Sequence, residues 1–230
     1  MSHSASPEPT DYAQHFRARR TFAASESALL LIDLQHASAS RHHGLGAQLA
    51  AMGRADEGQW RFDRIETTLL PNAQRLLAKA REAGGVVVHI ALGSGRDDFS
   101  DVPTHLRHLV ASTDNRVGQP SNSFLDGIVP LPDELVIRKT TADAFIHTGL
   151  DDHLREHGVR TLLLAGVSTN SCVESTARHG ADLDYDVVLV EDACAAASHS
   201  LHESSLTNLA RFFADVRSTV DVIGALEVTR

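Results

Sequence analysis

Short apolar runs alternate with amphipathic stretches along this chain, and this alternation constrains the fold more than any other feature. Four runs are hydrophobic at nearly every position, at 27–33, 86–91, 161–165 and 186–190. Runs that are apolar on both faces are typical of buried strands in a parallel sheet. Helical patterns lie between and after them, at 64–83, 149–157, 171–183 and 199–213. We therefore expect one three-layer α/β/α domain, with helices on both faces of a parallel sheet.

The rest of the chain refines this expectation. Weaker runs at 134–138 and 216–218 complete the expected strands, and Pro71 predicts a bend or a division in helix 64–83. Two long stretches have no clean period, 34–62 and 93–119, the second with a helical piece near 104–110. Such loops are often lids or binding loops, and 34–62 could equally form a subunit contact. Residues 1–24 are expected to be a tail with a short helix at 12–20, followed by the domain at 25–230.

Charge and hydropathy exclude several classes of protein. The formal net charge is −9, which argues against a nucleic-acid or membrane-surface partner. No run approaches the ~18 apolar residues of a membrane span. The two cysteines, Cys172 and Cys194, cannot make a disulfide framework, so a cytoplasmic setting is expected. Cys194 lies in an alanine-rich run, which predicts a buried, structural thiol.

The fourteen histidines raise the question of a metal. His42 and His43 are adjacent and cannot share a face of a helix or strand. His199 and His202 have helical spacing, but we expect their helix to lie at the surface. A zinc site needs three or four converging ligands, so we predict no metal.

The turn before Cys172 predicts a reactive thiol. The apolar run from Leu162 ends at Gly166, small polar residues follow, and a helical pattern resumes at Val173. This order predicts a strand, a tight turn and a helix, with Cys172 near the helix N-terminus. Unpaired N–H groups and the helix dipole favour a thiolate there. The alternative is that Cys172 is a small buried hydrophobe, as most free cysteines are.

Two charged residues follow other expected strands. Asp33 ends the first strand and Lys139 follows the third. Because the carboxyl ends of parallel strands meet at one edge of a sheet, both are expected beside Cys172. Either could instead be a turn residue or a solvated strand end. Together they make chemical sense, since a carboxylate can take the thiol proton and an ammonium favours both anions.

These residues resemble a known family. LLLIDLQ at 29–35, Arg138-Lys139 with Ala144-Phe145, GVSTNSCVEST at 166–176 and VED at 190–192 are similar to the isochorismatase-like cysteine hydrolases. That family includes N-carbamoylsarcosine amidase, ureidoacrylate, biuret and maleamate amidohydrolases, and nicotinamidases. The resemblance covers the chain from Ser27 to its C-terminus.

The resemblance implies a six-stranded parallel sheet in the order 3-2-1-4-5-6 and a cis peptide bond between Val167 and Ser168. It implies that the backbone N–H groups of Ser168 and Cys172 form an oxyanion hole, with Asp33 and Lys139 completing the catalytic set. Dimers or tetramers are usual in the family, so a homodimer or homotetramer is expected. Nicotinamidases add an Asp-x-His and a further His that hold a metal, whereas this chain has ALGSGR at 91–96. We therefore expect no cofactor.

The pocket is expected where the chain departs from the family. The usual aromatic after the first aspartate is replaced by Gln35-His36-Ala-Ser, so His36, Trp60 or Phe62 could form that wall. Asp143 replaces a usual serine and could bind an N–H-rich substrate or cap a turn. Gln35, His36, Trp60, Asp143, Phe145 and Asn170 are the candidate substrate-binding residues.

These residues predict a cysteine amidohydrolase that cleaves a small linear amide, ureido or carbamoyl compound through a thioester. One alternative is a vinyl-ether or imine hydrolase that does not use the thiol. Another is a non-catalytic binding member of the fold. A dinucleotide-binding domain is disfavoured, because no Gly-x-Gly-x-x-Gly follows the first strand.

Overall fold

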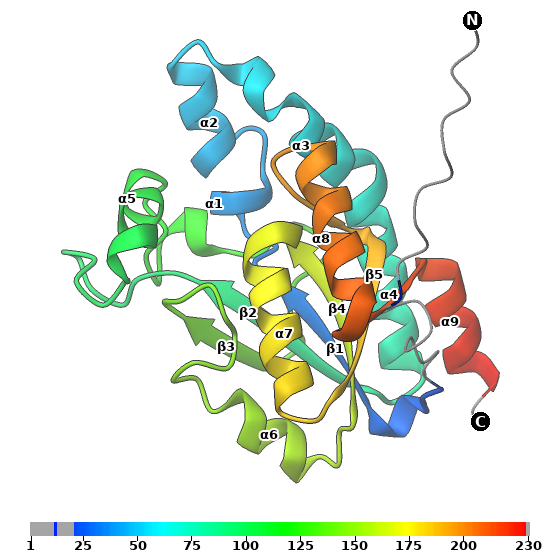
Figure 1. The fold of residues 1–230 in the computed structure, drawn as a ribbon. Helices are drawn as coiled ribbons and strands as arrows, with labels where there is room; N and C mark the ends of the chain where they lie inside the picture. The colour runs from blue at the N-terminus through cyan, green and yellow to red at the C-terminus, as the bar shows by residue number, and fades with distance from the viewer. Residues whose placement is uncertain (1–11, 13–20, 229–230) are drawn as a thin grey trace, which may run out of the picture.

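The computed structural model describes residue 12 and residues 21–228, which form a six-stranded sheet between two layers of helices (Figure 1). The strand order is β3-β2-β1-β4-β5-β6 and all neighbouring strands are parallel, which confirms the expected topology. The strands are β1 Ser27–Ile32, β2 Val86–Leu92, β3 Leu135–Lys139, β4 Thr161–Val167, β5 Asp186–Ala195 and β6 Asp215–Arg217. Apart from residue 12, the expected helix at 12–20 lies outside the described residues.

In the second half of the chain, helices alternate with strands as predicted. The first half contains more helices than the sequence pattern predicts. The α-helices are α1 His36–Ala39, α2 Gly44–Ala51, α3 Gln59–Arg64, α4 Leu70–Glu82, α5 Thr104–Ser112, α6 Leu150–Glu156, α7 Glu174–Asp182, α8 His199–Phe212 and α9 Thr219–Val228. The 3₁₀ turns are η2 Ala24–Glu26, η3 Ala55–Gly58 and η5 Pro120–Asn122, and the π turns are η4 Ile65–Leu69 and η6 Thr169–Val173.

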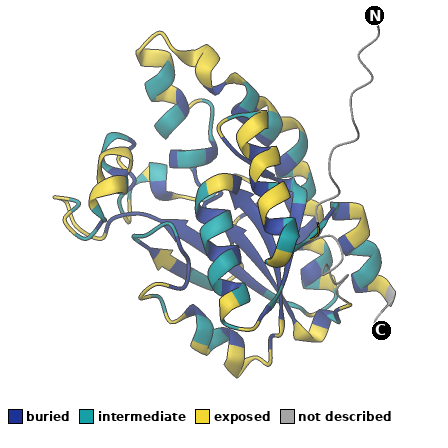
Figure 2. Cartoon of the chain, viewed as in Figure 1, coloured by how far each residue is buried: buried dark blue, intermediate teal, exposed yellow. Residues whose placement is uncertain are grey.

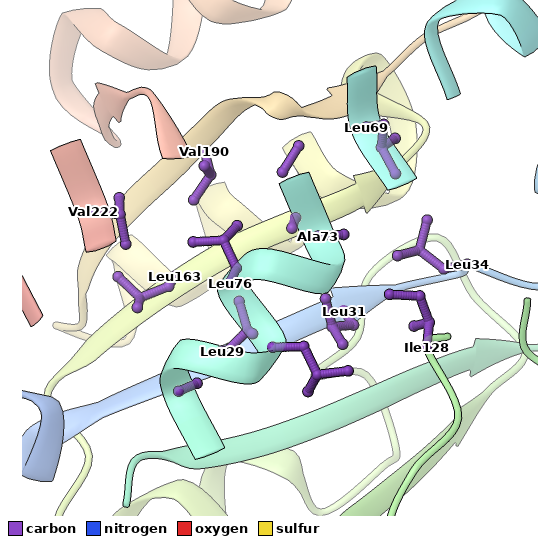
Figure 3. Close-up of a cluster of buried hydrophobic side chains, with 14 of the residues drawn as sticks. Leu29, Leu31, Leu34, Leu69, Ala73, Leu76, Ile128, Leu163, Val190 and Val222 are labelled. Carbon is purple, nitrogen blue, oxygen red and sulfur yellow. The ribbon is translucent and has the colours of Figure 1, made fainter. Parts of the chain in front are cut away.

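The side chains of β1 divide between the two faces of the sheet. Leu29 and Leu31 pack under α4 and α9, together with Leu163, Leu76 and other apolar side chains of that layer (Figure 3). Successive side chains of a strand point to opposite faces. This cluster therefore forms one half of the core.

The other half of the core lies under α6, α7 and α8. Leu30 and Ile32 of β1 pack there with Leu154 of α6, Ala177 of α7 and Leu209 of α8. The four central strands β1, β2, β4 and β5 are accordingly buried along most of their length, while the helices expose one side to solvent (Figure 2). Full burial of one leucine side chain contributes about 1.5–3 kcal/mol.

The expectation of an irregular 34–62 segment was wrong, because α1, α2, η3 and α3 occupy most of it. These helices have only four to eight residues each, too few to show a hydrophobic period in the sequence. The helix expected at 64–83 is a continuous helical segment in which α3 passes through η4 into α4. Pro71 is the second residue of α4, separated from the π turn by one residue, where the wider turn accommodates its missing N–H.

The strands β1 and β4 approach each other closely at their carboxyl ends. Gly166 pairs with Ile32 and has a φ of 132°, and a Cβ at this position would lie 2.0 Å from the Ile32 carbonyl oxygen. Only glycine tolerates both the contact and the backbone conformation. Because β1 and β4 flank the point where the strand order reverses, this contact brings the residues after both strands together.

Candidate active site

Asp33 leaves β1 in a left-handed conformation, with a φ of 53°. Its amide donates to the Ile90 carbonyl at 2.9 Å, and its carbonyl accepts from Ser38 Oγ at 2.6 Å. Aspartate tolerates this backbone region better than most residues. These bonds hold a carboxylate that is only 2% exposed. Its Oδ1 is buried and has no hydrogen-bond partner in the described part of the chain.

Lys139 is the last residue of β3 rather than the residue after it, and it crosses beneath β2 to reach Asp33. Its Nζ lies 2.9 Å from Asp33 Oδ2 and donates to the Thr141 carbonyl at 3.0 Å. The side chain is fully buried. Burial alone would lower the pKa of Lys139, but the Asp33 charge overcomes that effect and the pKa is raised. The ammonium therefore stays charged.

Cys172 lies in η6, directly before α7, as the turn pattern predicts. The thiol is buried, and burial together with the Asp33 carboxylate raises the pKa of Cys172 to about 12, against a smaller lowering effect of Lys139. The sequence expectation of a favoured thiolate was therefore wrong for the resting site. Desolvation disfavours the thiolate, so the proton stays on sulfur until a base removes it.

The turn between β4 and α7 is held by its own backbone and by α8. The peptide bond between Val167 and Ser168 is cis, as the resemblance implies. The Ser168 carbonyl accepts from Ser171 N at 3.0 Å and from Val173 N at 3.2 Å. Thr169 Oγ1 is 2.8 Å from Nδ1 of His202 on α8.

The helix α8 is a surface helix, as expected, but the His202 side chain on it is 0% exposed. Its Nε2 lies 2.9 Å from Nη2 of Arg64, and burial lowers the pKa of His202 to about 4. Arg64 itself donates to the Cys194 carbonyl at 2.8 Å. Cys194 is buried, as predicted. Through the contact of His202 with Thr169, this polar cluster holds the turn that carries Cys172.

A cavity of about 170 Å³ opens in front of the thiol. Asp33, Ser168 and Cys172 form its reactive end. Most of the remaining wall is apolar and comes from α2, β2 and α5, namely Leu45, Leu92, Leu106, Leu109 and Val110. The segment 34–62 thus contributes to the pocket, which supports its reading as a binding element.

Sequence reasoning missed Arg61, which also lines the cavity. It lies on α3 and is 5% exposed. Its Nη1 donates to Ser168 Oγ at 2.8 Å, and its Nη2 donates to the Ser38 carbonyl at 2.8 Å. The only available signal was a basic residue between Trp60 and Phe62, two residues that suggest a buried helix.

The first three candidate substrate-binding residues do not belong to the lining of this cavity. Gln35 is fully buried and braces the backbone, since its amide donates to the Asn122 carbonyl and accepts from Leu92 N. The His36 ring packs against that of His43. Trp60 packs against His199 and His202. Phe62, the other candidate for an aromatic wall, is part of the core.

The other three also lie away from it. Asp143 Oδ1 accepts from Phe145 N at 2.8 Å, so this side chain caps a turn, the second of the two expected roles. Its Oδ2 pairs with His179 Nδ1. The Phe145 ring packs against His179 and Tyr185. Asn170 is exposed to solvent.

The described residues contain no group of three or more His, Cys, Asp or Glu side chains that could hold a metal ion. Nor do they include a helix with the length and apolar composition needed to span a bilayer.

Comparison with known proteins agrees with this geometry. A family model described as the isochorismatase domain matches residues 27–221. A ureidoacrylate amidohydrolase, RutB, from Cronobacter sakazakii is 31% identical over 229 residues, which cover 91% of this chain and 94% of the relative. RutB from Acinetobacter baylyi is 29% identical over 221 residues, covering 89% of this chain and 85% of the relative.

Solved structures show the same fold. An isochorismatase family protein from Desulfovibrio vulgaris superposes with a TM-score of 0.74 at 28% identity, over 88% of this chain and 98% of the other. N-carbamoylsarcosine amidase from Thermoplasma acidophilum has a TM-score of 0.64 over 84% of this chain and 96% of the other. At 23% identity, the second likeness bears on the fold alone.

Proposed function

The chain belongs to the isochorismatase family, and from this premise we propose that it is a cysteine-dependent amidohydrolase. Its substrate would be a small linear amide, ureido or carbamoyl compound, cleaved at a C–N bond other than a peptide bond. One observation carries the proposal: Cys172 and the buried carboxylate of Asp33 line the same cavity. One oxygen of this carboxylate has no hydrogen-bond partner among the described residues, and the other is paired with Lys139. The amidohydrolase names of the RutB relatives support the reaction class.

In the proposed first half-reaction, Asp33 accepts the thiol proton as sulfur attacks the carbonyl carbon. Because the pKa of Cys172 is raised, this proton transfer is coupled to the attack rather than preceding it. The C=O electron pair moves to oxygen, where the backbone N–H groups of Ser168 and Cys172 would stabilise it. Asp33 then returns the proton to the leaving nitrogen, and ammonia or an amine departs to leave a thioester.

In the second half-reaction, Asp33 accepts a proton from water while the water oxygen attacks the thioester carbonyl. The C–S bond breaks, the proton returns to sulfur, and the acid or carbamate product leaves. Lys139 acts through Asp33, because its ammonium keeps the carboxylate ionised and fixes its orientation. No step requires an added cofactor.

Ammonia release from a panel of small amides, N-carbamoyl compounds and ureido acids tests the proposal. Cys172→Ala should lower turnover of an active compound by at least ~10³-fold, as expected for loss of a nucleophile. Cys194→Ala is the matched control, because this thiol is also buried but does not line the cavity. Undiminished hydrolysis by Cys172→Ala would contradict the covalent route.

A further inference from the structure

Arg61 is a buried cation without a carboxylate partner. Its guanidinium has no Asp or Glu oxygen within 4.0 Å in the part of the chain that the structure describes. Two of its N–H groups bond to the Ser38 carbonyl and one to Ser168 Oγ, so two of the five guanidinium N–H groups remain. Burying such an ion without a counter-charge costs several kcal/mol.

The charges around the cavity leave Arg61 unbalanced. Asp33 is the acidic residue in the cavity lining, and its charge is already matched by Lys139 at 2.9 Å. The neighbouring Cys172 carries its proton at rest. Burial lowers the pKa of Arg61 to about 10, against a smaller raising effect of nearby negative charge that includes Asp33, so the guanidinium is still charged at neutral pH. The reactive end of the cavity therefore has a net positive charge.

The cavity wall specifies a second property of the ligand. Apart from the reactive end, it is built mainly from leucine, valine and alanine side chains, including Leu45 of α2 and Leu106 and Val110 of α5. Such a wall favours burial of a carbon skeleton over that of a fully polar molecule. A ligand that matches both parts has one anionic group and an aliphatic body.

We propose that Arg61 binds a carboxylate of the substrate, so that the enzyme acts on aliphatic acids that carry the ureido, carbamoyl or amide group. This inference rests on the proposed function and names its substrate class. The guanidinium is the side chain best suited to a carboxylate, because its planar N–H groups can bind both oxygens. Arg61 thus acts as a specificity-determining residue supplied by α3.

Alkylation of Cys172 with two reagents of nearly equal size tests the anion site without any turnover. Iodoacetate carries a carboxylate and iodoacetamide is neutral, and both react with the same thiolate, so their rate ratio is independent of the thiol pKa. Each ratio is divided by that of free cysteine, and the modified residue is identified by mass spectrometry. In the parent protein we expect a normalised ratio on the order of tenfold in favour of iodoacetate.

Three variants locate the effect. Arg61→Met should lower the normalised ratio about tenfold, whereas Arg61→Lys should keep most of it because the charge remains. Arg75→Met is the matched control, since Arg75 is an exposed arginine on the same continuous helical segment. An unchanged ratio in Arg61→Met overturns the proposal. A parent ratio at or below one overturns it as well, even if Arg61→Met does not fold.

A matched pair of ureides then tests the substrate class. N-carbamoyl-leucine and 3-methylbutylurea differ only in the carboxylate, and we expect the parent to prefer the acid through a lower KM. Arg61→Met should raise KM for the acid by about tenfold more than it raises KM for the neutral ureide. An equal loss of kcat for both overturns the proposal in favour of a role at the reacting carbonyl. Absence of turnover for every compound contradicts the amidohydrolase proposal, and the alkylation ratio remains a separate test of the anion site.

Discussion

Removal of Asp33 should destabilise the protein more than removal of a surface charge would, because it leaves Lys139 buried without its counter-ion. The two charges are 2.9 Å apart and their side chains are at most 3% exposed. Breaking a buried ion pair by removing one partner costs about 3–5 kcal/mol. We therefore expect Asp33→Asn and Lys139→Met each to lower the free energy of unfolding by about 3–5 kcal/mol.

The double variant separates this effect from simple loss of contacts. When Asp33→Asn and Lys139→Met are combined, neither member of this ion pair is left buried without the other. The main loss is then the bond from Lys139 to the Thr141 carbonyl, which contributes about 1 kcal/mol. The double variant should therefore lie within about 2 kcal/mol of the parent, far from the sum of the two single changes.

Urea unfolding monitored by circular dichroism measures all four proteins, with the midpoint compared at constant m. For a chain of this length, about 3–5 kcal/mol corresponds to a fall in Tm of roughly 6–20 °C. Additive losses in the double variant would refute the reasoning, because they would show that the two side chains stabilise the fold independently. All three variants should be inactive, and the unfolding experiment measures their stability independently of activity.

Three further predictions concern the surroundings of the site. Gly166→Ala should cost about 2–6 kcal/mol in a urea titration, from the clash with the Ile32 carbonyl plus backbone strain. Gly158→Ala, which has a positive φ but open space around its Cβ, should cost only about 1–2 kcal/mol, and equal losses would contradict the clash argument. Because the pKa of His202 is about 4 in the folded protein and near 6.5 when unfolded, protonation destabilises the fold: the unfolding free energy should fall by up to about 3 kcal/mol as the pH drops from about 6.5 to 4. His202→Gln should flatten that part of the pH profile, and an unchanged slope would assign it to other groups. Cys194→Ala should leave iodoacetamide labelling of the protein intact, whereas loss of labelling would place the reactive thiol at Cys194.

Much of the fold could be predicted because its signals are local. A strand such as Ser27–Ile32 must be apolar on both faces to be buried in a parallel sheet, and each amphipathic helix shows its own period. The strand order came from the resemblance and is confirmed. The short helices of 34–62 could not be predicted, because four to eight residues give too few turns for a hydrophobic period.

Some residues of the candidate site could be identified from the sequence, and others could not. Asp33 and Cys172 were identified because each follows a buried strand beside the point where the strand order reverses. The six candidate substrate-binding residues were chosen by position in the sequence, and the structure places them outside the cavity lining. Arg61 could not be identified in advance, because its position depends on how α3 packs against the turn at Ser168.

The sequence by itself determined the parallel sheet and the position of the nucleophile turn, since both depend on the order of apolar and small residues over a few positions. Only the tertiary structure decided the state of the site, because charge and protonation depend on burial among residues far apart in the chain. Burial keeps the proton on Cys172, brings Lys139 to Asp33 across β2, and leaves Arg61 without a counter-ion in the cavity wall. Desolvation is a property of the assembled fold, and here it sets the protonation of the thiol beside a buried cation.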